Sequence, residues 1–522
     1  MMGYGQPHNT VKEVATPLSA RALFLQDHLK KNLLIVHLEQ AFVTMAIKEE
    51  VLKRLTNSHP EWKITEASLL MIAQHTHSAP GGYSHYPMYN FTIPGFNLTV
   101  FHKIVGGVME AIELAYKDLA PSELSYGEID IAPEKEVAFN RSLHSHQNNT
   151  ETPRLRPEEK NLAVDRKMKG LKISREGKLR GIINWFGVHA TSISSFNHRI
   201  HYDNKGVAAA LFEKNYPGTI ALFAQESAGD ISPNFRWDKK LNRMVGKFND
   251  QYENAEFNGE IQFREAEKIS YEKSLQGEIK SLHTFVDVTK LTTAPAHGVA
   301  FFEGTLEGPG VPPALASILK VVSRTVKKIN LMKNPELHQK FYEEHAPKDV
   351  LLDHRNGSFL GIPLGVWKKL PPLPDPTVEF FRKDAKSGSV DTLPWVPPIL
   401  PFQLIFLGPL LIICVPGEIT VTAGNRLKNF LKHELLGHGI EEIIISSYAN
   451  CYMGYITTPQ EYETQSYEAG HTVYGRNTLS AIFTGFGELV REFKDFNYNR
   501  TLNTPPFHYP PEELAKRTVS SK

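Results

Sequence analysis

Two histidines separated by a single residue, His75 and His77, follow an apolar run and precede a loop of small residues. The run, residues 69–73, is typical of a buried strand, and the Pro-Gly-Gly at residues 80–82 ends it. Because residues i and i+2 of an extended chain point to the same side, both imidazoles would project together beyond the strand end. Imidazole is a common zinc ligand. The pair therefore predicts half of a zinc site.

Four further stretches share this pattern of an apolar strand followed by polar and small residues. They are residues 182–192, which contain His189, residues 220–234, residues 411–418, which end at Glu418, and residues 443–458. If these strands lie in one sheet, their ends can converge. Two histidines, a glutamate and a water molecule would then make a catalytic zinc site.

Each of these residues also has a purely structural interpretation. A single histidine after a strand, such as His189, is more often a hydrogen-bonded core residue, and Glu418 could cap the helix expected from Thr420. Residues 229–232 are also typical of a turn. The sequence lacks the Gly-x-Ser-x-Gly elbow, His-Glu-x-x-His, a phosphate loop and Gly-x-Gly-x-x-Gly. Spacing alone indicates a hydrolase and leaves both interpretations open.

The composition is that of a globular protein and excludes several classes. Hydrophobic residues make up 41% and charged residues 22% of the 522 residues. Lysine plus arginine, 58, balances aspartate plus glutamate, 57, so nucleic acid is not an expected partner. The two cysteines, Cys414 and Cys451, exclude a disulfide framework and a cysteine-rich zinc site. No apolar run reaches the length of a transmembrane helix.

Strand and helix patterns alternate along the chain, which predicts an α/β fold. We expect strands at residues 33–38, 69–74, 179–188, 219–225, 409–415 and 443–447. We expect helices at residues 42–55, 101–119, 204–214, 259–276, 420–435 and 479–493. The expected architecture is a mixed β-sheet core flanked by helices, with long loops rich in proline and glycine and the active site at the strand ends.

The proline-rich stretches at residues 301–313 and 370–401 are expected to be irregular loops within one domain. We expect residues 1–522 to form a single catalytic domain, with a core at residues 1–498 and an extended tail at residues 499–522. The first seven residues show no basic region followed by an apolar core, and therefore no signal peptide.

Ordered motifs are spread over nearly the whole chain. They are Met1-Met2-Gly3-Tyr4, His75-Thr76-His77-Ser78, Pro80-Gly81-Gly82-Tyr83, Asn140-Arg141-Ser142, Asn184-Trp185-Phe186 with His189, Asp203-Asn204-Lys205-Gly206, Gly229 through Asn234, Gly304-Thr305 with Gly308-Pro309-Gly310, Pro416-Gly417-Glu418, Ala423-Gly424, Tyr455-Ile456-Thr457-Thr458 through Tyr462, Tyr467-Glu468-Ala469 and Tyr474-Gly475. With these motifs the chain resembles the catalytic domain of the neutral (neutral/alkaline) ceramidases, zinc amidases that cleave ceramide into sphingosine and a fatty acid.

The resemblance implies one zinc ion per chain, with His75, His189, Glu418 and Tyr455 as ligands. Tyr455 enters through the resemblance alone, because phenol is an uncommon zinc ligand, although a nearby cation stabilises phenolate. The resemblance also implies different roles for His75 and His77. The family counterpart of His77 contacts the substrate or the transition state and does not complete the metal shell.

The resemblance also implies a mechanism in which zinc activates a water molecule and polarises the amide carbonyl. His77, Arg141 or Tyr467 would help to stabilise the oxyanion, and His77 is the first candidate to protonate the leaving amine. Ser232 matches a serine that is important in the family. We expect it to hydrogen-bond the hydroxyl end of a sphingoid substrate, with a nucleophilic role as the second choice.

The expected activity is hydrolysis of the N-acyl bond of ceramide. The alternatives are a zinc amidase of this fold that acts on another N-acyl lipid or lipoamino acid, and a non-catalytic binding homologue. A transient contact with a membrane surface would fit a lipid substrate. The resemblance implies secretion or a periplasmic location, whereas the missing signal peptide leaves a cytoplasmic location open.

The sequence departs from the family pattern at several positions. Ala79 stands where the family usually has glycine, and residues 190–192 also differ, so we expect a reshaped pocket. Because the sequence ends at Lys522, we expect the β-sandwich domain that usually follows the catalytic domain in this family to be absent.

Overall fold

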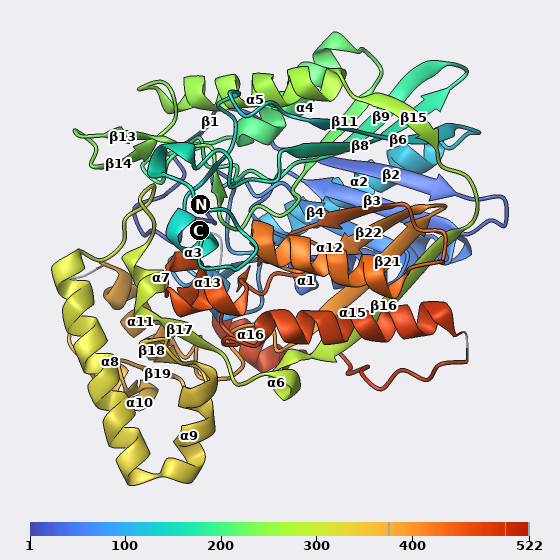
Figure 1. Ribbon diagram of the computed structural model, residues 1–522. Helices are drawn as coiled ribbons and strands as arrows, with labels where there is room; N and C mark the ends of the chain where they lie inside the picture. Colours follow the sequence, from blue (N-terminus) through green and yellow to red (C-terminus); the bar gives the residue numbers. More distant parts are fainter. Residues whose placement is uncertain (374–375, 496, 520–522) are drawn as a thin grey trace.

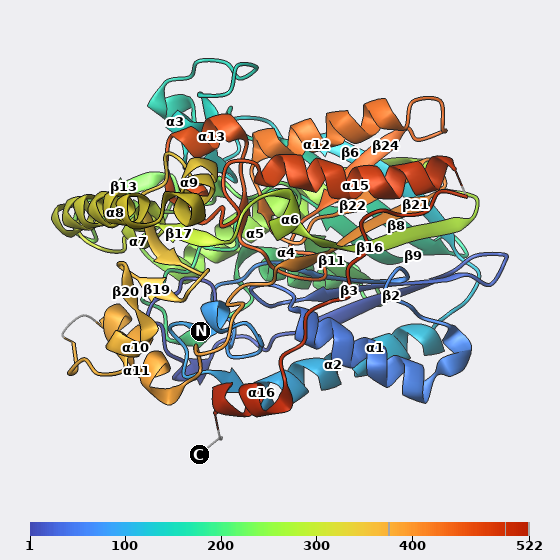
Figure 2. The same ribbon diagram turned by 90° about the horizontal axis from the view of Figure 1, so that it is seen from below.

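Two layers of β-structure face each other across a shared apolar core, and helices cover both outer faces (Figures 1 and 2). The computed structural model describes residues 1–373, 376–495 and 497–519. One layer is a five-stranded sheet in the order β11-β9-β8-β6-β15, with β6 Glu123–Asp130, β8 Lys167–Arg175, β9 Lys178–Trp185, β11 Ile220–Ala224 and β15 Ser270–Ser274. The second layer combines two sheets, β2-β3-β4 (Ala20–Gln26, Asn32–Leu38, Leu69–Ala73) and β16-β21-β22-β24 (Ile279–Asp287, Ile399–Leu407, Leu410–Cys414, Glu442–Ser446).

Side-chain alternation along the strands builds the core between these layers. Ile35 of β3, Ile183 of β9 and Ile412 of β22 all enter one buried cluster that the three sheets share. Their strand neighbours Val36 and Ile413 belong to other clusters, in which the sheets pack against helices. Because both faces of these strands are buried, their sequences are continuously apolar rather than alternating.

The outer faces of the sheets are covered by pairs of helices (Figures 1 and 2). Helices α1 (Met45–Ser58) and α2 (Leu98–Lys117) pack on the three-stranded sheet. Helices α4 (Asp203–Asn215) and α5 (Gln251–Glu267) pack on the five-stranded sheet, and α12 (Val421–Glu434) and α15 (Thr478–Lys494) pack on the four-stranded sheet.

The edges of the two smaller sheets meet near the site. Ile72 of β4 forms an isolated antiparallel bridge with Ala449, and the backbone N–H of Asn450 donates to the carbonyl oxygen of Met71 (2.8 Å). This contact joins the chain after β24 to the side of β4. The residues that follow both strands are therefore close together in space.

A smaller part of the chain lies beside these layers and includes the sheet β17-β18-β19-β20 (Ala296–Gly298, Val350–Asp353, Ser358–Phe359, Ile362–Pro363). Helices α8 (Pro313–Lys333) and α9 (Pro335–Glu344) form an antiparallel pair that projects from the body in Figure 1. Helices α10 (Leu364–Trp367) and α11 (Pro376–Ser387) complete it. In the part of the chain that the structure describes, no helix combines the length and apolar character needed to cross a bilayer.

The predicted α/β architecture is confirmed, but several local expectations are wrong. The strands do not lie in one sheet, since β4, β9 and β22 belong to three different sheets. The helix expected at residues 259–276 ends at Glu267 and is followed by strand β15, which pairs with β6. Tertiary strand pairing overrides local periodicity at this point.

Two stretches expected to be irregular contain regular elements. Residues 370–401 include α11, and the expected extended tail includes α16 (Pro511–Arg517) and β26 (Thr518–Val519). Strand β26 pairs in parallel with β5 (Phe96–Asn97), a partner more than 400 positions away that no local pattern could indicate.

We predict that Ile412→Ala lowers the free energy of unfolding by about 2–5 kcal/mol, because it opens a cavity in the core that all three sheets share. Ile412 is fully buried between β21 and β24. Leu436→Ala removes a side chain that is 79% exposed and should change stability by less than about 0.5 kcal/mol. Urea unfolding curves for both variants provide the measurement. If Ile412→Ala and Leu436→Ala unfold at the same urea concentration, the proposed core is contradicted.

Candidate active site

His75 follows β4 in a backbone conformation that residues other than glycine seldom adopt. Its φ is 74°, in the left-handed region. Its backbone N–H donates to the carbonyl oxygen of Gln40 (3.0 Å), and its Nδ1 lies 2.5 Å from the carbonyl oxygen of Ala41. Because a carbonyl oxygen can only accept, this contact places the proton on Nδ1 and leaves a lone pair on Nε2.

His189 is oriented in the same way after β9. Its backbone N–H donates to the carbonyl oxygen of Ile231 (3.0 Å), and its Nδ1 lies 2.9 Å from the same oxygen. The side-chain amide of Asn204 donates to the carbonyl oxygen of His189 (3.0 Å). The Nε2 lone pair of His189 therefore also points away from its anchoring strand.

Glu418 and Tyr455 are direct neighbours across a short parallel pair of strands, β23 (Glu418–Ile419) and β25 (Tyr455–Ile456). Glu418 Oε2 lies 3.0 Å from His189 Nε2 and 3.4 Å from His75 Nε2. The Tyr455 hydroxyl lies 3.4 Å from His189 Nε2. The four side chains come from separate elements, and each residue is at most 3% exposed. Together they form one compact set of nitrogen and oxygen donors.

The charge of Glu418 is compensated by its neighbours. Tyr448 donates to its Oε2 (3.1 Å) and Tyr452 donates to its Oε1. Burial opposes ionisation, but His75 and His189 hold the pKa of Glu418 well below its usual range. The sequence pattern indicates neither tyrosine as part of the site, although Tyr448 directly follows the expected strand at residues 443–447 and Tyr452 lies in the same loop.

His77 belongs to the same cluster but is held differently. Its Nε2 lies 3.0 Å from His75 Nε2, and the Nε2 or Nδ1 atoms of His75, His77 and His189 could also hold a metal together. Its Nδ1, however, is buried without a hydrogen-bond partner among the described residues. The ring packs edge-on against Tyr4 at 4.5 Å between centroids. His77 therefore lacks the carbonyl anchor that orients the other two imidazoles.

Arg141 connects Tyr455 to a carboxylate. Its Nη2 donates to the Tyr455 hydroxyl (2.9 Å) and to the carbonyl oxygen of Gly229 (3.0 Å), while its Nε donates to Glu468 Oε1 (2.9 Å). The guanidinium lies 5.6 Å from the ring centroid of Tyr467. The sequence interpretation missed Glu468, although that residue stands inside the quoted motif at residues 467–469.

Ser232 lies close to the cluster but is not directed into it. It is fully buried in β12 (Ile231–Ser232), and its Oγ accepts a hydrogen bond from the backbone N–H of Asn234 (2.8 Å). Within the described residues no histidine, lysine or carboxylate side chain hydrogen-bonds to this hydroxyl. The position therefore supplies no base that would activate Ser232 as a nucleophile.

A cavity of about 560 Å³ opens onto the cluster. His77, Arg141, Glu418, Tyr455 and Tyr467 line its polar end, whereas His75, His189 and Ser232 lie behind this surface. Apolar side chains form much of the remaining wall, and they include Phe42, Met88, Phe91, Ile93, Phe301, Phe302 and Val311. The cavity therefore suits a molecule with a polar reacting centre and an apolar chain.

The expectation that Ala79 reshapes the pocket directly does not hold, because this residue is fully buried and does not line the cavity. Its carbonyl oxygen accepts a hydrogen bond from the backbone N–H of Met2 (3.1 Å), and Met2 lines the cavity. Thr191, from the divergent stretch 190–192, does line the cavity.

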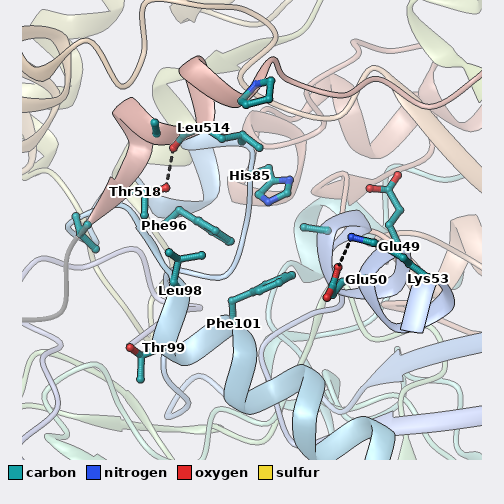
Figure 3. A pocket seen from close by; sticks show the side chains of 14 residues that line it. Glu49, Glu50, Lys53, His85, Phe96, Leu98, Thr99, Phe101, Leu514 and Thr518 are labelled. Carbon is teal, nitrogen blue, oxygen red and sulfur yellow. Dashed lines mark hydrogen bonds and ion pairs between the residues drawn. The ribbon is translucent and has the colours of Figure 1, made fainter. Parts of the chain in front are cut away.

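A larger cavity of about 1000 Å³ lies elsewhere, between α1, α2 and the C-terminal α16 and β26 (Figure 3). Phe96, Phe101 and Leu514 line it together with His85. None of the eight residues predicted for the site lines this cavity. Its size alone therefore does not mark it as the place of the chemistry.

A second buried group, His146, Asp230 and Glu461, fixes the loops around the site. Asp230 Oδ2 accepts from Asn140 Nδ2 (2.7 Å), and Asp230 Oδ1 accepts from the backbone N–H of Val421 (2.9 Å). These bonds tie the residue before Arg141 to the start of α12, which follows Glu418. Burial, followed by the charge of Asp230, raises the pKa of Glu461 to about 7.

Nitrogen and oxygen donors converge at the end of a half-apolar cavity, carried on two β-layers between helices, which is the arrangement of an enzyme active site in an α/β protein. Residues 1–360 and 385–484 match the family model for the N-terminal domain of neutral/alkaline non-lysosomal ceramidases. The chain therefore belongs to the neutral/alkaline ceramidase family.

Individual relatives agree with this assignment. The neutral ceramidase of Pseudomonas aeruginosa is 31% identical over 94% of this chain and 70% of its own length. Neutral ceramidase B of Dictyostelium discoideum is 29% identical over 95% of this chain and 70% of its own length. A solved structure described as a ceramidase complexed with C2 superposes with a TM-score of 0.79 at 28% identity, covering 97% of this chain and 74% of that one.

We predict that Glu461→Gln flattens the dependence of stability on pH. Because the folded protein raises the pKa of Glu461 from 4.5 to about 7, the stability linked to this proton is complete below pH 4.5 and is lost as the pH rises through 7. The variant should remove a stability difference of about 3 kcal/mol between acidic and alkaline pH. Thermal melts across this range test it. Glu463→Gln, at a partly exposed residue of the same helix, should keep the wild-type profile.

Proposed function

We propose that this protein is a zinc-dependent ceramidase that hydrolyses the N-acyl bond of ceramide to a sphingoid base and a fatty acid. The observation that carries the proposal is the meeting of His75, His189, Glu418 and Tyr455 at the polar end of an apolar-walled cavity. Ceramide combines an amide with two long apolar chains, which matches the polar and apolar parts of this cavity.

The donor set fits zinc. His75 and His189 each bond a backbone carbonyl through Nδ1, so each offers an Nε2 lone pair in a fixed direction. Glu418 adds a carboxylate and Tyr455 a phenol that a cation would help to ionise. Zinc bound there would act as a Lewis acid and lower the pKa of a water molecule.

The residues of the chain have separate tasks in this proposal. Arg141 holds the Tyr455 hydroxyl and is positioned to stabilise negative charge that develops on the amide oxygen. Hydrolysis breaks the C–N bond and adds water, so the departing nitrogen needs a proton. His77 lines the cavity and has an unanchored ring, which supports it as the proton donor.

Tyr467 and Ser232 have supporting tasks in this proposal. Tyr467 lines the cavity and packs against the guanidinium of Arg141, which supports a role in orienting the substrate. Ser232 is buried behind the cavity wall and accepts one hydrogen bond from Asn234, which leaves its O–H able to donate to a sphingoid head group. The absence of a neighbouring base favours binding over nucleophilic attack at this serine.

We predict that the purified protein releases fatty acid and sphingoid base in equal amounts from short-chain ceramide. Mass spectrometry of both products provides the measurement. Arg141→Lys should reduce kcat by about 10²–10³-fold, because a lysine lacks the planar guanidinium that bonds Tyr455, the Gly229 carbonyl and Glu468 together and faces the oxyanion. Release of fatty acid from another N-acyl lipid, with none from ceramide, would instead favour the alternative amidase.

We predict that His75→Ala and His77→Ala differ in metal content. His75→Ala should lose stoichiometric zinc together with activity, because it removes an anchored donor. His77→Ala should keep zinc and lose about 10²–10⁴-fold in kcat, because it removes a proton donor. Elemental analysis and kinetics of the two variants test this assignment. Loss of zinc in both variants would make His77 a ligand, and unchanged zinc in His75→Ala would remove His75 from the ligand set.

A further inference from the structure

Helix α8 exposes an apolar stripe on the side that faces away from the protein. Leu315, Ile318, Val321, Ile329 and Met332 are 39%, 59%, 63%, 43% and 75% exposed. At about 100° per residue these positions fall within an arc of about 120°. The buried residues Ala316 and Ser323 lie on the opposite side of the helix. The exposed stripe is therefore separate from the surface that packs on the body.

The same helix is strongly basic in a chain whose net charge is only +1. It contains Lys320, Arg324, Lys327, Lys328 and Lys333 and no acidic residue. Two of these charges are neutralised within the protein, since Lys320 pairs with Glu303 and Arg324 pairs with Asp349. Among the described residues, Lys328 and Lys333 form no ion pair. The stripe thus lies beside free positive charge.

The hairpin of β13 (Arg236–Asp238) and β14 (Arg243–Val245) has the same character on the same side of the molecule, at the left in Figures 1 and 2. Trp237 is 44% and Leu241 is 50% exposed. Lys239 and Lys240 lie between them in the exposed turn and form no ion pair in the described part of the chain. Tryptophan beside lysine is typical of protein segments that enter the interface of a lipid bilayer.

The loop that precedes α8, residues 304–312, forms part of the rim of the catalytic cavity and contacts the hairpin. The backbone N–H of Met244 in β14 donates to the carbonyl oxygen of Leu306 (2.7 Å), and Leu306 is itself 62% exposed. Thr305 and Glu307, on either side of Leu306, line the cavity, as does Pro312 at the start of α8. Exposed apolar groups therefore continue from the hairpin across the cavity rim to α8.

We propose that this face, defined by the tip of the β13–β14 hairpin, Leu306 and the outer stripe of α8, docks on an anionic lipid bilayer and turns the cavity toward the membrane. The apolar side chains would enter the interface, and Lys239, Lys240, Lys328 and Lys333 would contact lipid phosphates. The proposal deepens the proposed function, on which it rests, because a lipid substrate could then reach the cavity from the bilayer.

Sedimentation with vesicles that contain no ceramide tests docking independently of catalysis. The full chain should bind phosphatidylcholine vesicles that contain phosphatidylglycerol, and salt should weaken this binding. Ile318→Glu with Val321→Glu, and separately Lys239→Glu with Lys240→Glu, should each weaken binding at least about tenfold. Leu114→Glu, at an exposed position of α2, should bind like the wild type. Wild-type affinity in both double variants would overturn the proposal.

Two further measurements separate this proposal from its alternatives. The double variants should hydrolyse a water-soluble short-chain ceramide at the wild-type rate but lose activity toward ceramide embedded in vesicles. If the wild type binds anionic vesicles without cleaving any ceramide, the proposed function fails while docking stands. If sedimentation velocity shows that Ile318→Glu with Val321→Glu converts a dimer into a monomer while vesicle binding is unchanged, a second copy of the chain occupies this face and the bilayer proposal fails.

Discussion

The constraint on which the site depends is the burial of the Glu418 carboxylate. An ionised carboxylate removed from water is costly unless positive charge or hydrogen bonds replace its hydration. Here Tyr448 donates to Oε2 and Tyr452 donates to Oε1. The Nε2 lone pairs of His75 and His189 face Oε2, so a cation bound between them would supply the positive charge. These partners come from three places, the ends of β4 and β9 and the loop between β24 and β25. Compensation of this single charge therefore requires that all of these segments be in place.

The β-layers meet this requirement through hydrogen bonds of the backbone. The carbonyl oxygens of Ala41 and Ile231 fix the two imidazoles, and the parallel pairing of β23 with β25 sets Glu418 beside Tyr455. These backbone hydrogen bonds leave little freedom to the side chains. The conformational entropy of orienting them is therefore lost during folding rather than when a ligand binds. The strained backbone at His75 is maintained by the same surroundings.

The two ends of the cavity differ in polarity. Its inner end is buried and charged, with Arg141 held between Tyr455 and Glu468. Its rim includes the loop around the exposed Leu306, which precedes α8 and is hydrogen-bonded to the β13–β14 hairpin. A substrate with a polar reacting bond and apolar chains would satisfy both ends at once. The cavity therefore connects the donor cluster at the strand ends to the outer surface of the molecule.

The sequence by itself determined the α/β class, the strands β3, β4, β9, β11, β22 and β24, several long helices, and the association of His75, His189 and Glu418 with strand ends, but it missed the long strands β2, β6, β8, β16 and β21 and the helix α8. These properties follow from short-range periodicity, which a local window of sequence contains. The proposed roles of Tyr455 and His77 came from family motifs, since no spacing indicates them, and they stay predictions. Only the tertiary structure decided that three sheets meet at the site and that Tyr448 and Tyr452 bond Glu418, because these contacts depend on strand pairing between distant segments. The same holds for the outer stripe of α8, whose exposure depends on which face the rest of the chain covers.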